Sequence, residues 1–208
     1  CLIQRYTFAN GARYVSGNRC ERIYTNGTTA VENGRNAYEE KRKCLFGELG
    51  VRSEELGVNS QLSTHNSQLK IGLPRCLNIF EEYPFWHALF TACGIEVVLS
   101  SPSDYGRYER VARQIMSDNI CFPAKLAHAH VQELVDRRVD RVFMPFVVYE
   151  RSQGEQNSYN CPVVTGYSQV IKSVQTTDVP IDAPVFSFKD EKTLYRQCRR
   201  YLLGLGVD

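Results

Sequence analysis

The chain has 208 residues, a formal net charge of +2, 43% hydrophobic and 23% charged residues. This balance is typical of one medium globular domain with an appendage, and it excludes a chain that is mainly disordered. The weak charge argues against nucleic-acid binding, and no apolar stretch reaches the roughly 20 residues of a membrane-spanning helix. The chain starts at Cys1 with a segment too polar for a signal peptide, so we expect a piece of a longer, cytoplasmic protein.

The first third of the chain differs in composition from the rest. Residues 1–67 are polar and rich in Gly, Asn, Ser and Arg, and only Asn36–Leu45 has a helix-like pattern. We therefore expect an N-terminal extension and linker that is partly irregular, followed by a second domain over residues 68–208.

Beyond residue 68, short apolar runs alternate with helical patterns. The runs predict strands at 69–73, 95–99, 141–148 (interrupted by Pro145) and 184–188. Helices are predicted at 84–93, 105–116, 123–137, 166–174 and 190–203, with Asp104 and Asp190 as N-caps and Gly94 at one C-terminus. The Glu81-Glu82 pair would precede a helix and complement its dipole. This order predicts an α/β fold, with an open, mostly parallel, Rossmann-like sheet and helices on both faces.

The chain has eight cysteines and no Cys-x-x-Cys pair. A chain of this size builds its own core, so we expect free thiols rather than disulfides. Cys121 is followed by Pro123, which suits the first turn of a helix. The helix dipole there would favour a thiolate, so a ligand or reactive thiol and a small loop residue are equally good interpretations.

Two more cysteines and a lysine are candidates for the same site. Cys161, in an Asn-Cys-Pro sequence after a predicted strand, could meet Cys121 at one sheet edge, although its spacing alone favours a loop cysteine without function. Cys20 lies among Gly and Arg residues, which fits a tight loop over an anionic cofactor but fits an ordinary solvated turn better. Lys125, in the first turn after Cys121, could reach an anionic cluster or face solvent.

The two central histidines do not form a metal-binding pair. His128 and His130 are two residues apart on a predicted helix and face different sides. His130 shares a stripe with Leu126 and Leu134, which favours a hydrogen-bonded core histidine. The chain also has no P-loop, no G-x-G-x-x-G after a strand and no G-x-S-x-G, which disfavours nucleotide binding by those routes and a hydrolase elbow.

Several short motifs together resemble a known family. They are Ile71–Asn78 followed by Tyr83–Trp86, Val97–Ser100, Cys121–Leu126 with His128 and His130, and Asn160–Val164. The chain resembles the central, uncharacterised domain of large CoA-substrate-specific enzyme activases, which is related to components of 2-hydroxyglutaryl-CoA dehydratase. Upstream, Tyr14–Arg22 is similar to the segment that follows the activator modules, except that Ile23 stands where glycine is expected. The resemblance is clearest over Lys70–Lys172.

The resemblance implies an oxygen-sensitive electron-transfer system. In this family, ATP-driven activator modules carrying a [4Fe-4S] cluster pass a low-potential electron to a cysteine-ligated cluster in a partner component. The electron enables radical removal of water from a 2-hydroxyacyl-CoA. Three cysteines from separate loops hold each partner cluster. By this resemblance Cys121 and Cys161 are metal ligands, Cys20 is the third candidate, and Lys125 would offset the cluster charge.

The first hypothesis is therefore an iron–sulfur electron-transfer domain of a redox-activated lyase system, not a complete enzyme by itself. Its partners would be ATP-dependent activator modules and a downstream dehydratase-like domain, and an isolated fragment can lack its [4Fe-4S] cluster. The alternative is a cluster-free scaffold that docks the activator modules through an exposed Tyr83–Trp86 segment. A closed four-ligand zinc site is a weaker third hypothesis. The sequence leaves open the acyl group and the oligomeric state, a homodimer included.

Overall fold

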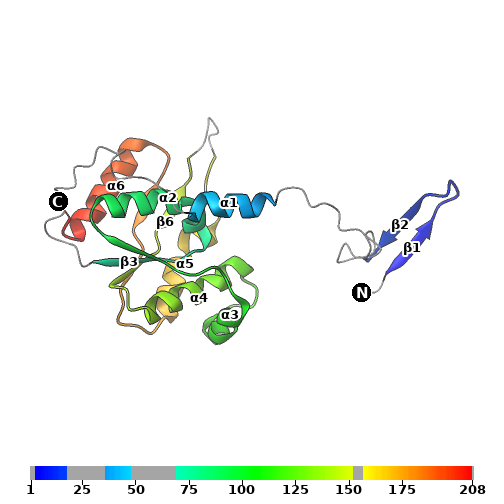
Figure 1. Ribbon diagram of the computed structural model, residues 1–208, viewed down its shortest axis with the longest axis horizontal. Coiled ribbons are helices and arrows are strands. Elements are labelled where there is room, and N and C mark those ends of the chain that lie inside the picture. The colour runs from blue at the N-terminus through cyan, green and yellow to red at the C-terminus, as the bar shows by residue number, and fades with distance from the viewer. Residues whose placement is uncertain (1–2, 18–35, 48–68, 152–156, 208) are drawn as a thin grey trace. The chain divides into compact units, whose positions relative to one another are not determined.

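The computed structural model describes residues 3–17, 36–47, 69–151 and 157–207. The chain divides into two compact units, Cys1–Lys43 and Cys44–Asp208 (Figure 1). The domain boundary expected after residue 67 lies outside the described residues.

The N-terminal part contains a hairpin and a helix. Strands β1 (Gln4–Thr7) and β2 (Arg13–Ser16) pair antiparallel. Helix α1 (Ala37–Phe46) begins after Asn36, whose side-chain oxygen accepts the N–H groups of Tyr38 and Glu39, so this predicted helix is confirmed. The hairpin was not predicted, because its side chains are exposed or half-buried and show no apolar alternation.

The second unit is built on a four-stranded parallel sheet in the order β4-β3-β5-β7. Its strands are β3 (Lys70–Leu73), β4 (Glu96–Leu99), β5 (Arg141–Phe143) and β7 (Ile181–Asp182). In the register, Gly72 lies opposite Val98 on one side and Val142 on the other. The mostly parallel sheet is therefore confirmed, whereas β7 was missed because it is only two residues long.

The run predicted as one interrupted strand forms two strands. Pro145 has no N–H to donate, and β5 stops before it. Beyond the break, β6 (Phe146–Tyr149) pairs parallel with β8 (Val185–Ser187). Backbone hydrogen bonds from Met144 to Asp182 and from Phe146 to Pro184 connect the two pairs across the break.

Five helices cover the two faces of this sheet, and a 3-10 turn, η2, extends one of them. They are α2 (Leu77–Ala92), α3 (Tyr105–Val111) with η2 (Ala112–Gln114), α4 (Phe122–Asp136), α5 (Pro162–Val174) and α6 (Glu191–Gly204). Val142 packs with α4 and α5, whereas its neighbour Phe143 packs with α2 and α6. Figure 1 shows α2 and α6 on one side of β3 and α4 on the other. The predicted α/β fold with helices on both faces is confirmed.

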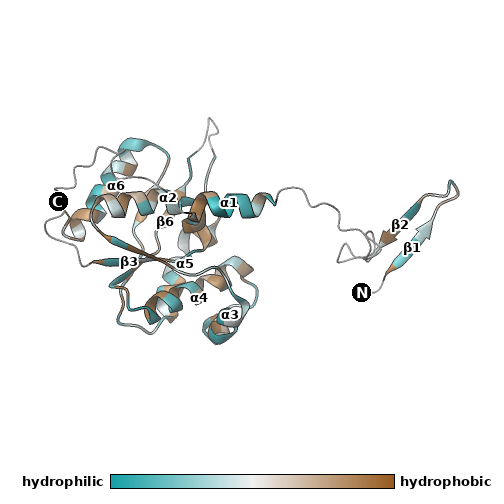
Figure 2. Ribbon diagram, in the orientation of Figure 1, coloured by the Kyte–Doolittle hydropathy of each residue, from teal (hydrophilic) through white to brown (hydrophobic). Residues whose placement is uncertain are grey.

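Most predicted helix ends are correct. Asp104 and Asp190 cap α3 and α6 by accepting the N–H groups of Arg107 and Thr193. Gly94 follows α2 with a φ of 72°. Helix α3, expected to reach residue 116, ends at Val111, where the backbone tightens into η2. In Figure 2, α6 mixes hydrophilic and hydrophobic residues, as a helix with one face on the core should. None of the helices in the described ranges is long and apolar enough to cross a membrane.

Helix α2 corrects two expectations. It begins at Leu77, seven residues before the predicted start, and so contains Pro84. The helix persists through the proline because Trp86 and its neighbours on the same face are fully buried. The Glu81-Glu82 pair therefore lies inside the helix, not before it. Because Trp86 is buried, the Tyr83–Trp86 segment is not the exposed contact surface expected for a scaffold.

Candidate functional site at the carboxyl edge of the sheet

The carboxyl ends of the parallel strands form the edge where functional groups gather in open α/β sheets. Helix α2 follows β3, α5 follows β6, and α4 returns from the β4 side to β5. The N-termini of α2, α4 and α5 therefore lie at this edge. Their N-cap residues are Cys76, Cys121 and Cys161.

Cys121 begins α4, as predicted, and its side chain is exposed. Pro123 lies in the first turn and has no N–H. The main-chain carbonyl of Cys121 accepts the next two N–H groups, from Ala124 at 3.1 Å and Lys125 at 3.3 Å. The thiol makes no capping hydrogen bond. Its sulfur is thus sterically open to a ligand at the positive end of a helix.

Cys161 has nearly the same geometry at the start of α5. Its φ and ψ are −63° and 152°, against −61° and 149° at Cys121. The Val164 N–H donates to its sulfur at 3.4 Å. Helix α5 starts at Pro162, four residues before the predicted start, and this makes Cys161 an N-cap rather than a loop residue. Hydrogen bonds to sulfur of this kind tune the potential of iron–sulfur sites.

One hollow lies between the segment that precedes α4 and the first turns of α5, next to both cysteines in the sequence. The hollow has a volume of about 340 Å³, and its walls include Ile120, which precedes Cys121, and Pro162, which follows Cys161. Its other lining residues are Met116, Ser117, Val163, Gly166, Tyr167 and Val170. Burial raises the pKa of Tyr167, and the nearby Cys121 adds to this rise. Cys121 and Cys161 are thus each adjacent in sequence to a wall residue of one mainly apolar depression.

The described parts of the chain contain no third ligand for a metal at this place. No group of three His, Cys, Asp or Glu side chains among the described residues could hold a metal ion. Cys20, the predicted third ligand, lies outside the described residues. Cys76 begins α2 but is buried in the core, and burial raises the pKa of its thiol far above the usual range.

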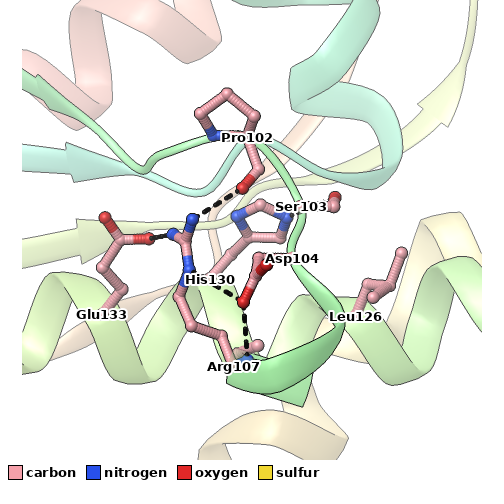
Figure 3. Close-up of a pocket in the computed structure, with 8 residues that line it drawn as sticks. Pro102, Ser103, Asp104, Arg107, Leu126, His130 and Glu133 are labelled. Atoms are coloured by element: carbon pink, nitrogen blue, oxygen red, sulfur yellow. Dashed lines mark hydrogen bonds and ion pairs between the residues drawn. The ribbon is translucent and has the colours of Figure 1, made fainter.

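His130 of α4 faces the loop after β4, beside a narrow crevice lined by both segments (Figure 3). Its Nδ1 and Nε2 lie 2.9 Å and 3.0 Å from the hydroxyl oxygens of Ser100 and Ser103. The Ser100 hydroxyl oxygen also accepts the Arg75 N–H at 2.7 Å, which links the loop after β3 to the same histidine. Burial lowers the pKa of His130 to about 4. His130 is a neutral, hydrogen-bonded core histidine, as predicted.

Glu133, one turn further along α4, holds the same loop. Its carboxylate accepts the Ser101 N–H at 3.1 Å, the Ser101 hydroxyl at 2.6 Å and the Arg107 guanidinium at 2.6 Å, and it also pairs with Arg137. Burial alone would raise the pKa of Glu133, but the bonds from Ser101 and the two arginines lower it overall. These contacts fasten the β4 loop to α4, which is a structural role.

A comparison with protein-family models matches residues 70–208 to the CoA enzyme activase uncharacterised domain. The chain belongs to this family. The matched region runs from β3 to the end of the chain and includes Cys121, Lys125 and Cys161, but not Cys20. No curated protein and no solved structure matches. Membership confirms the family resemblance and suggests partner modules within a larger protein.

Lys125 of this activase domain is engaged with the backbone. Its ammonium donates to the main-chain carbonyl of Asp118 at 2.7 Å, which ties the turn before Cys121 to the first turn of α4. An anionic group near Cys121 would compete with this hydrogen bond. The role of Lys125 beside a cofactor stays a prediction.

The sequence patterns did not reveal a buried polar cluster beside Cys161. Glu82 of α2 accepts the Trp86 indole N–H at 2.7 Å, and Glu150, just after β6, accepts the Asn160 amide at 2.7 Å. Asn160 directly precedes Cys161. The available signal was the four-residue spacing that places Glu82 and Trp86 on one helix face, but it appears only if α2 starts well before Pro84.

Proposed function

We propose that this activase domain binds an iron–sulfur cluster through Cys121 and Cys161 and transfers electrons as part of a 2-hydroxyacyl-CoA dehydratase-like system. The supporting observation is that both thiols are exposed N-cap residues of neighbouring helices beside one hollow. Cysteine thiolates are the usual ligands of such clusters. Cys20 would supply the third thiolate of a [4Fe-4S] group.

The chemistry of the described residues fits such a group. Each of the two thiols is the N-cap of a helix, whose positive end would favour a negatively charged group bound to the sulfur. The Val164 N–H already donates to the sulfur of Cys161, and the hollow has mainly apolar walls. When bound, the cluster would supply one-electron transfer at low potential. The chain's own residues would hold it, orient it and limit its contact with water.

In this proposal the domain is one module of a larger electron-transfer protein rather than a complete enzyme. ATP-dependent activator modules would deliver the electron, and a downstream dehydratase-like domain would receive it. The cytoplasm is the expected compartment, because its reducing conditions keep thiols free.

A second candidate is a cluster-free docking domain. It is favoured by the exposed apolar side chains near the hollow beside α5. Its contact surface would be the apolar rim of the same hollow, since Met116 is 77% exposed and the nearby Phe122 49% exposed. Tyr83–Trp86 is not available for this purpose, because Trp86 is buried.

Metal and sulfide analysis after anaerobic purification or reconstitution separates the two candidates. The chain would be studied with its natural neighbouring modules, as wild type and as Cys121→Ser, Cys161→Ser and Cys20→Ser. Cys44→Ser is the matched control, since Cys44 is an exposed thiol on α1. The proposal expects stoichiometric iron and sulfide that are lost in the first two variants and kept in the control. Folded wild type without iron supports the docking domain, and zinc without sulfide supports a zinc site.

A further inference from the structure

Glu82 is a carboxylic acid buried in the middle of α2. It is 9% exposed, and its Oε2 accepts the Trp86 indole N–H at 2.7 Å and the Asn78 amide at 3.4 Å. Its second oxygen, Oε1, has no hydrogen-bond donor among the described residues. A buried, half-satisfied carboxylate of this kind is costly, so the free oxygen calls for a physical explanation.

The explanation lies in Glu150, which follows β6. The Glu150 side chain lies within hydrogen-bonding reach of the Glu82 side chain. Two ionised carboxylates only accept hydrogen bonds, so a bond between them requires a proton on one. Burial raises the pKa of Glu82 to about 9 against the opposing Trp86 bond, and the Glu150 charge raises it further. Glu82 is buried whereas Glu150 is only half-buried, so Glu82 is the donor of the pair.

No opposite charge neutralises this pair in the described part of the chain. The ion pairs there involve other carboxylates. Two cations belong to adjoining segments: Arg151 follows Glu150, and the Lys189 ammonium lies 5.6 Å from the Tyr149 ring centroid. Without a paired cation, a shared proton is the means by which two adjacent carboxyl groups avoid repulsion.

The pair is connected to the backbone that leads into Cys161. Asn160 uses its amide hydrogens on Glu150 Oε1 at 2.7 Å and on the Val147 carbonyl at 3.1 Å. Its main-chain N–H donates to the Val148 carbonyl at 3.2 Å. Asn160 is thereby held on three sides, one of them by Glu150, immediately before the N-cap of α5.

We propose that Glu82 and Glu150 share one proton at neutral pH and that this pair, acting through Asn160, positions Cys161. Glu82 and Glu150 are thus positioning residues. The consequence for Cys161 as a cluster ligand rests on the proposed function, whereas the shared proton does not. Sharing a proton also leaves one negative charge rather than two beside the place where an anionic cluster would bind.

Infrared spectroscopy of the full chain with ¹³C-labelled glutamate tests the shared proton. A protonated carboxyl band is expected at neutral pH in the wild type. The band should disappear in Glu82→Gln and remain in Glu81→Gln, a matched control at the adjacent exposed position. The absence of such a band in the folded wild type, or its survival in Glu82→Gln, would overturn the proposal.

The positioning role is tested by the rate at which iodoacetamide alkylates Cys161, measured by mass spectrometry relative to Cys121 in the same iron-free protein. Asn160→Ala and Glu82→Ala should change this ratio several-fold. Glu82→Gln should keep the wild-type ratio, because its amide can donate to Glu150 as the protonated acid does. An unchanged ratio in Asn160→Ala would contradict the proposal, and that variant serves alone if Glu82→Ala does not fold. Both measurements omit iron, so failure of cluster binding leaves their outcome unaffected.

Discussion

The Tyr167 hydroxyl of α5 lies 2.9 Å from the Nε2 atom of His128 in α4. The two rings meet edge to face, with their centroids 5.6 Å apart. The contact links the two helices that begin at Cys121 and Cys161, each within two turns of its cysteine. It therefore helps to fix how the two candidate ligands are spaced.

Removing this hydroxyl should destabilise the domain. Tyr167→Phe leaves the buried Nε2 of His128 without its partner, and we expect a loss of about 1–3 kcal/mol in the free energy of unfolding. Urea denaturation measures it. Tyr195→Phe is the control, because Tyr195 is 68% exposed, and it should change stability little. Equal effects of the two substitutions would mean that the His128 contact contributes nothing specific.

The buried acid of α2 predicts a pH dependence of stability. The pKa of Glu82 is about 9 in the folded chain, against a usual value of 4.5, so folding takes up a proton between these values. Its contribution to stability is complete below the lower value and is lost as the pH rises to the upper one. The slope is at most about 1.4 kcal/mol per pH unit.

The free energy of unfolding, measured by denaturation at about pH 6 and about pH 8.5, checks this dependence. Both pH values lie between the usual and the raised pKa of the carboxyl group. Glu82→Gln carries no titrating group, so its stability should fall less over this range. Glu81→Gln should keep the wild-type slope. A Glu82→Gln protein with the same slope as the wild type would show that Glu82 does not carry the proton.

Strand β3 lies so close to α4 at Gly72 that adding a single methyl group there should reduce stability. A Cβ added at Gly72 would lie 3.0 Å from Val139 Cγ2 and 3.1 Å from Leu134 Cδ1, both core atoms. Gly72→Ala should therefore lower the free energy of unfolding by about 1–3 kcal/mol. At Gly204, near the end of α6, a Cβ meets nothing within 4 Å, and Gly204→Ala should be neutral or slightly stabilising. Thermal denaturation of the two variants provides the comparison.

The sequence predicted best where local chemistry decides the structure. The Asp104 and Asp190 caps and the start of α4 after Cys121 depend on a few adjacent residues, and all are confirmed. The start of α2 was predicted wrongly because of Pro84. The energetic cost of a proline inside a helix is outweighed there by the burial of Trp86, which the sequence alone does not reveal. Strand β7 exists because it pairs with β5, a long-range contact that no short window contains.

For the candidate site, the sequence supplied candidate residues but not their surroundings. The motifs made Cys121 and Cys161 candidate ligands, which stays a prediction, and the structure adds that both are helix N-caps. The burial of Glu82 was not predicted, because a glutamate shortly before a proline suggests the start of a helix rather than a buried acid. Its partner Glu150 lies 68 residues away in the chain, so only the fold brings them together.

Electron paramagnetic resonance of the anaerobically reduced protein, with its neighbouring modules present, tests the central claim most directly. The account predicts a cluster signal in the wild type and in Cys44→Ser that is lost in both Cys121→Ser and Cys161→Ser. Folded wild type without a signal and without iron, or a full signal in the Cys121→Ser/Cys161→Ser double variant, would contradict it.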